Sequence, residues 1–195
     1  MSWKFAIGVA LASAALTAPA HAKKPVAADE AEIRSMIERV YAPYSQPYPD
    51  APEDGSARPD NDPGAAMDGY ELPYSATLDK LVAQWSGLMQ ATDELYRLNS
   101  FDWYCQCQDN DNATSKLVRQ TYKQAGKDRI DVNVLFSPGR YEGRDMGEPL
   151  LFRFKREGGA WKLDELKFHR SGSLRRGLAK DIDDAITDKI KGTGD

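Results

Sequence analysis

The sequence predicts an α+β protein in which N-terminal helices pack on a curved antiparallel sheet of about three to four strands, with a short C-terminal helix. Three observations lead to this fold class. Apolar residues recur at spacings of three and four in two N-terminal stretches, then alternate with polar residues in the middle of the chain, and return to a helical spacing near the C-terminus. This order of helices, strands and a final helix is typical of α+β domains.

Residues 23–44 are expected to hold the first helix, which ends before Pro43 because proline does not continue a helix. Residues 45–74 then form a loop rich in proline and glycine, with seven acidic side chains against Arg58 alone. A segment with so few apolar residues and one sign of charge is expected to be disordered or loosely packed on the surface. The α+β domain itself is assigned to residues 75–190.

The second helix is predicted to begin at Ser75, because a serine hydroxyl suits the N-cap position. Its apolar stripe includes Trp85 and Met89 and leads to an expected end at Asn99-Ser100. The stripe could form a ligand-binding face, but core packing is the favoured interpretation.

Alternating apolar and polar residues predict strands at residues 130–136, 150–156 and 160–168. Residues 116–124 fit either a one-turn helix or a fourth strand. After the last strand, Ser173 is expected to cap the C-terminal helix, in which apolar residues recur every four positions.

The last strand changes parity within its length. Its first two large apolar residues share one face, but the next two fall on the opposite parity (Trp161, Leu163, Leu166, Phe168). One inserted residue lets all four point to the same side, so we predict a β-bulge near Asp164-Glu165.

The first 22 residues have the three parts of a secretory signal peptide. Lys4 is followed by an apolar run from Phe5 to Leu16 and by Ala20-His21-Ala22, the small-x-small pattern that signal peptidase accepts. The run is shorter than the roughly 20 residues of a membrane span, although an N-terminal anchor is the alternative. We therefore expect cleavage after Ala22, no stable membrane span afterwards, and a periplasmic or secreted product.

Charge bears on the class of partner. The formal net charge is −4 at pH 7, and no basic face of the kind that binds phosphate backbones is evident. Nucleic acid is therefore not expected as a partner. The acidic loop and the basic group Arg170, Arg175 and Arg176 are two charged surfaces on which an envelope protein could dock.

Three residues are candidates for acid–base catalysis: Asp164, Glu165 and His169. The two acids are the better placed, because a bulge redirects side chains. The structural alternative is that they are solvated acids on a strand. His169 follows the last strand and is expected on the surface.

Cys105 and Cys107 are the two cysteines of the chain, and export predicts their oxidation. A direct bridge requires a bend, because residues two apart in an extended strand lie near the upper limit of Cα spacing for a disulfide. A structural Cys105–Cys107 bridge, buried or separately oxidised thiols, and a role in thiol redox exchange or soft-metal binding all stay open. No metal site and no cofactor is predicted, because two thiols without a neighbouring histidine are too few for structural zinc.

Several segments together resemble a known group of proteins. They are Phe101 to Asp109, Asp128 to Val132, the segment Glu157-Gly158-Gly159-Ala160-Trp161-Lys162-Leu163-Asp164, and the helix start Gly172-Ser173-Leu174-Arg175. Over roughly residues 75–178 the chain resembles small exported bacterial proteins of unknown function with a nuclear transport factor 2-like (cystatin-like) cone. The resemblance implies a curved sheet wrapped around helices, with a pocket in the cone.

That superfamily contains enzymes such as ketosteroid isomerase and scytalone dehydratase as well as proteins that only bind, so the fold does not decide the function. The leading hypothesis is an exported, non-catalytic binding protein of the bacterial envelope whose ligand is a partner protein or a small apolar molecule. One alternative is a periplasmic isomerase, lyase or hydrolase that uses Asp164 or Glu165. Another is a thiol redox protein that uses Cys105 and Cys107. A homodimer is also left open.

Overall fold

The computed structural model describes residues 27–45, 72–91, 98, 102–106, 115–141, 144–145, 147–169 and 172–192. The helices within these ranges are α1 (Ala27–Tyr41), the short 3₁₀ helix η1 (Pro43–Ser45), α3 (Ala76–Gln90) and α4 (Leu174–Gly192). The strands are β1 (Lys116–Gly126), β2 (Arg129–Ser137), β3 (Arg140–Tyr141), β4 (Arg144–Asp145), β5 (Pro149–Glu157), β6 (Ala160–Phe168) and β7 (Gly172–Ser173). The predicted α+β class is confirmed.

The main sheet is antiparallel and open, with the strand order β1-β2-β5-β6-β7. β3 and β4 pair separately as a small hairpin. Residues 116–124, which the sequence left ambiguous, belong to β1. A two-residue turn joins β5 to β6, and Gly158 and Gly159 occupy it with φ of 61° and 86°, a backbone conformation that glycine adopts without steric cost.

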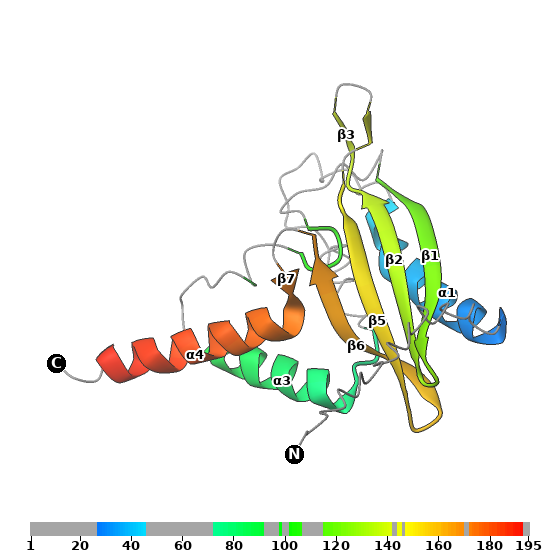
Figure 1. Cartoon of the computed structure of the whole chain (residues 1–195). Coiled ribbons are helices and arrows are strands. Elements are labelled where there is room, and N and C mark those ends of the chain that lie inside the picture. Colours follow the sequence, from blue (N-terminus) through cyan, green and yellow to red (C-terminus); the bar gives the residue numbers. More distant parts are fainter. Residues whose placement is uncertain are drawn as a thin grey trace, which may run out of the picture.

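The core lies between α1 and one face of the sheet. Each central strand contributes alternate buried residues to this face, and pairing aligns them in rows, such as Val132 opposite Phe152 and Phe152 opposite Leu166. From α1, Tyr41 stacks on Phe136 with 4.7 Å between ring centroids. In Figure 1, α1 lies behind β1 and β2, where its apolar stripe meets this face.

α3 and α4 pack against β6 and against each other. They run side by side away from the β6 side of the sheet (Figure 1). Ser75 is the N-cap of α3, as predicted. The helix ends at Gln90, before the expected end at Asn99-Ser100, and residues 92–97 lie outside the described part of the chain.

The β-bulge that the parity of β6 predicts is confirmed. Phe154 pairs with Leu163 and Arg153 pairs with Glu165, so Asp164 is the extra residue in β6. All four large apolar residues of β6 are consequently buried (Trp161, Leu163, Leu166, Phe168). The bulge also buries Asp164 and Glu165 themselves.

Two predicted segments cannot be compared with the structure. The signal peptide of residues 1–22 lies outside the described residues, and so does most of the acidic loop of residues 45–74. In the described part of the chain, no helix combines the length and the apolar character needed to cross a membrane.

Candidate functional site

The two candidate catalytic acids at the bulge are buried. Asp164 is 7% exposed and Glu165 is 8% exposed. A carboxylate loses much of its hydration at such a position and requires hydrogen-bond donors from the protein. Their partners therefore decide whether these groups are available to a substrate.

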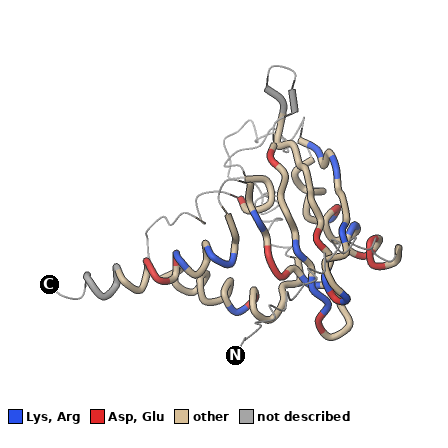
Figure 2. The backbone as a smooth tube through the Cα atoms, viewed as in Figure 1, with Lys and Arg blue, Asp and Glu red and all other residues tan. Residues whose placement is uncertain are grey.

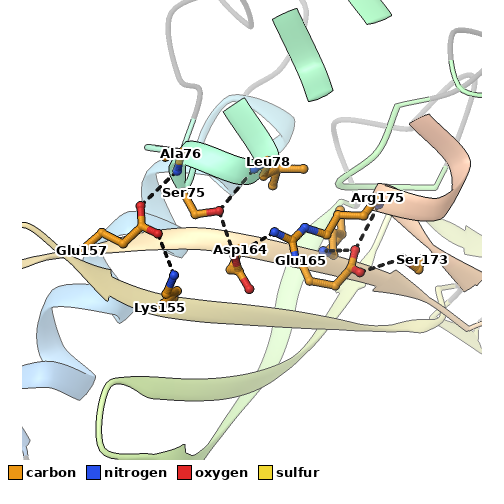
Figure 3. A network of polar contacts seen from close by, with 10 residues as sticks. Ser75, Ala76, Leu78, Lys155, Glu157, Asp164, Glu165, Ser173 and Arg175 are labelled. Carbon is orange, nitrogen blue, oxygen red and sulfur yellow. Dashed lines mark hydrogen bonds and ion pairs between the residues drawn. The ribbon is translucent and has the colours of Figure 1, made fainter. Parts of the chain in front are cut away.

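Asp164 binds the start of α3. The Ser75 hydroxyl donates a hydrogen bond of 2.8 Å to Asp164 Oδ1 and accepts one of 3.3 Å from the backbone N–H of Leu78 (Figure 3). Ser75 thus caps the helix and connects it to β6. A negative charge beside a helix N-terminus is stabilising, because the first N–H groups of the helix point toward it.

A third carboxylate, from the end of β5, also contacts this helix terminus. Glu157 accepts hydrogen bonds from the backbone N–H of Ala76 at 3.0 Å and from Lys155 Nζ at 2.8 Å. The Lys155 hydrogen bond, followed by that of Ala76, holds the pKa of Glu157 below its ordinary value. Glu157 is therefore charged at neutral pH and complements the positive end of α3.

Glu165 binds the start of α4 in the same way. Its Oε2 accepts a hydrogen bond of 2.6 Å from the Ser173 hydroxyl, and its Oε1 accepts backbone N–H groups of Leu166 at 3.0 Å and Arg175 at 3.2 Å. Ser173 in turn accepts the backbone N–H of Arg176 at 3.2 Å, which makes it the predicted cap of α4.

Arg175 joins the two capping groups. Its side chain extends from the first turn of α4, and one Nη atom lies 3.2 Å from Asp164 Oδ1 (Figure 3). Its Nε is buried and has no hydrogen-bond partner among the described residues. The site is therefore a junction at which the bulge of β6 holds two helix N-termini, and its carboxylates accept hydrogen bonds from the chain itself.

The side chains of His169 and Arg176 do not join this junction. His169 follows β6 and is exposed. Arg176 is exposed on α4, whereas Arg175 is ion-paired with Asp164, and Arg170 lies outside the described residues. Arg175 and Arg176 were predicted to belong to one basic docking surface. In the structure the first is held in an ion pair and the second is exposed to solvent.

A second buried polar cluster surrounds the turn at residues 102–106. The Tyr41 hydroxyl donates to the Tyr104 carbonyl at 2.8 Å, and the Tyr44 hydroxyl donates to Asp102 Oδ2 at 2.6 Å. Asp102 Oδ1 accepts the backbone N–H groups of Tyr104 and Cys105. Burial, together with the Asp102 charge, raises the pKa of Tyr41 and of Tyr44 well above the ordinary value.

Cys105 lies in this cluster, is 6% exposed and is disulfide-bonded. Its sequence neighbour Gln106 has a φ of 58°, so the chain bends sharply directly after Cys105. Cys107, the other cysteine of the chain, lies outside the described residues. Burial within the core favours a structural role for the disulfide over thiol exchange, which requires access.

Asp181 of α4 was missed by the sequence reasoning. It is 2% exposed, and its Oδ2 accepts the Trp85 indole N–H at 3.3 Å and the backbone N–H of Leu98 at 3.1 Å. The signal was its position, because an acid three residues after Leu178 and seven after Leu174 falls on the apolar stripe of the helix. Asp181 therefore connects α4 to α3 through Trp85 and to the backbone at Leu98.

No group of three or more histidine, cysteine, aspartate or glutamate side chains in the described ranges has the geometry to hold a metal ion.

Comparison with known proteins leaves the family unassigned. No protein-family model and no curated protein matches the chain. A solved structure from Bacteroides thetaiotaomicron, described as a protein of unknown function, is similar at 16% identity with a TM-score of 0.36, over 71% of this chain and 92% of that one. A likeness this weak carries no argument, and the nuclear transport factor 2-like cone stays a prediction.

Glu165→Ala should destabilise the protein by about 2–3 kcal/mol, because it leaves two backbone N–H groups and the Ser173 hydroxyl without their acceptor. Glu165→Gln should cost less, since it keeps a carbonyl oxygen. Urea denaturation measures both, and Glu32→Ala at an exposed position of α1 is the control. Equal stability of Glu165→Ala and Glu32→Ala would contradict the capping role.

Stability should fall as the pH rises above about 10, the ordinary pKa of tyrosine. The folded-state pKa values of Tyr41 and Tyr44 are raised. As the pH rises, the two tyrosines therefore lose their hydroxyl protons in the unfolded chain before they do so in the folded protein. The free energy of unfolding is unaffected below about pH 10 and falls steadily as the pH rises from there toward the folded-state pKa. Denaturant titrations across this range measure the slope, which should be shallower in Tyr44→Phe. The same slope in both proteins would show that Tyr44 is not the group responsible.

Proposed function

We propose that the protein is exported and acts, without catalysis, as a binding protein of the bacterial envelope whose ligand is a partner protein. The observation that carries this proposal is the state of the two candidate catalytic acids. Asp164 and Glu165 accept hydrogen bonds from Ser75, Ser173 and Arg175, which hold α3 and α4. A general acid or base needs to reach a substrate proton, and these groups are engaged with the protein's own donors.

The packing of the inner sheet face favours a protein partner over a small apolar ligand. Tyr104 stacks on Phe152 with 6.1 Å between centroids, and Tyr41 and Tyr44 pack around Phe136. The protein's own aromatic side chains thus occupy the face on which a cone-like fold would bind a small molecule. A surface on the outside of the sheet or helices is left as the place for a partner.

The disulfide at Cys105 supports export. Disulfides persist in the periplasm and outside the cell and are rare in a reducing cytosol. This fits the signal peptide that the sequence predicts at residues 1–22. Export followed by cleavage after Ala22 is therefore part of the proposal.

Expression of the full chain in a bacterium should give a periplasmic or secreted product whose N-terminal residue is Lys23, because signal peptidase cleaves after Ala22. Ala22→Leu should block this processing and serves as its control.

The processed protein, immobilised at low and at moderate salt, should retain a specific protein from an envelope extract. An unprocessed cytoplasmic product would overturn export, and no specific retention would overturn the binding role.

A further inference from the structure

The two edges of the main sheet differ in how they are protected. Along β6, the backbone of Leu163 accepts from Ser75 N–H at 2.8 Å and donates to the Pro73 carbonyl at 2.7 Å. Further along, β7 pairs with the end of β6. This edge is therefore covered by two short segments of the same chain, which is one of the ways in which proteins prevent unwanted strand pairing.

The opposite edge of the sheet is formed by β1, which is a long strand. β1 has 11 residues and none of them is buried. It pairs with β2 on one side, and along residues 119–124 no hydrogen bond joins its outer backbone edge to another described residue. Register shifts occur near both ends, but residues 119–124 form a regular ladder. A regular stretch of this length presents a row of backbone donors and acceptors to which another strand can add.

The charges on β1 have one sign. The strand carries Lys116, Arg119 and Lys123 and no acidic residue, and its basic segments are visible in Figure 2. Arg119, Thr121 and Lys123 are all exposed and share one face, because side chains alternate along a strand. Among the described residues, neither Arg119 nor Lys123 has an ion-pair partner.

These charges disfavour a second copy of the same edge, paired about Thr121, as the partner. Antiparallel pairing of two β1 strands about Thr121 would set Arg119 of one copy opposite Lys123 of the other. Like charges directly opposite each other destabilise strand pairing. A strand that carries acidic residues opposite Arg119 and Lys123 would instead be attracted to this edge.

We propose that the β1 edge binds an extended acidic segment of a partner protein by strand addition, with two carboxylates four residues apart facing Arg119 and Lys123. The inference rests on the proposed function and names the class of its partner. On the other face of β1, the ring of Tyr122 is fixed under Arg34 of α1, with 5.0 Å from the guanidinium carbon to the ring centroid. In the added strand, the residue opposite Thr121 is the central one. The Tyr122 ring offers an apolar contact to the residue directly before or after it. Val118, which is 41% exposed, adds apolar surface next to Arg119.

Two synthetic peptides of equal composition test the spacing. One is a β-forming decapeptide with glutamates at positions i and i+4, on one face; the other has them at i and i+3, on opposite faces. The first should bind the purified protein about tenfold more tightly in fluorescence anisotropy, and should slow hydrogen exchange of the amides in residues 119–124. Equal affinity of the two peptides, equal binding of polyglutamate, or no protection in β1 would overturn strand addition.

Two single variants with the same change in charge test the residues. Arg119→Glu should weaken binding of the i, i+4 peptide about tenfold, because it replaces attraction with repulsion. Arg176→Glu, at an exposed position of α4, should leave the affinity within about twofold. Circular dichroism verifies that both variants fold. Equal loss in both would reduce the effect to net charge and overturn the assignment to β1.

The same variants separate this inference from the proposed function. If Arg119→Glu retains the envelope protein that the wild type retains, the binding role stands and the β1 edge is wrong. If the wild type retains no protein, the proposed function fails, and the peptide titrations still decide whether the edge accepts an acidic strand.

Discussion

The extra residue in β6 is the constraint on which the arrangement of the helices depends. Leu163 and Leu166 both reach the core because Asp164 is left unpaired between them. If Asp164 took a regular place in the ladder instead, the period of two along a strand would turn one pair of apolar residues out of the core. The insertion sets two adjacent carboxylates against α3 and α4, and the start of each helix supplies the donors that buried acids require.

This arrangement links the fold to the proposed function. Acids that are buried at a bulge suggest catalysis, since bulges and buried carboxylates are both frequent in active sites. Here the hydrogen bonds from Ser75, Ser173 and Arg175 give these acids a structural task. The features that remain for recognition lie on the outside of the sheet. One edge is covered by residues 73–75 and β7, whereas no described residue pairs with the outer side of residues 119–124 in β1, where Arg119 and Lys123 are exposed.

The sequence predicted the parts of the fold that have a clear period. β2, β5, β6 and the bulge follow from alternation and its change of parity, and the hydroxyls of Ser75 and Ser173 marked the starts of two helices. Residues 116–124 were ambiguous for a physical reason: the inward face of β1 is only half-buried and mixes apolar with polar residues, so it lacks a clear apolar alternation (Leu117, Gln120, Tyr122, Gln124). The partners of Asp164 and Glu165 were not predictable, because their donors come from positions distant in the chain or from the first turn of a helix. Asp181 could have been found as an acid on an apolar helix stripe.

Deletion of Asp164 tests the role of the bulge most directly. After the deletion Leu163 still pairs with Phe154 and Glu165 with Arg153, so the register of β5 and β6 stays intact. The start of α3 loses the carboxylate that accepts the hydrogen bond of the Ser75 hydroxyl. Hydrogen exchange followed residue by residue should then show faster exchange at the start of α3, including Leu78, with protection retained in β5, β6 and the start of α4. Unchanged protection of α3, or loss of protection throughout the sheet, would contradict the account.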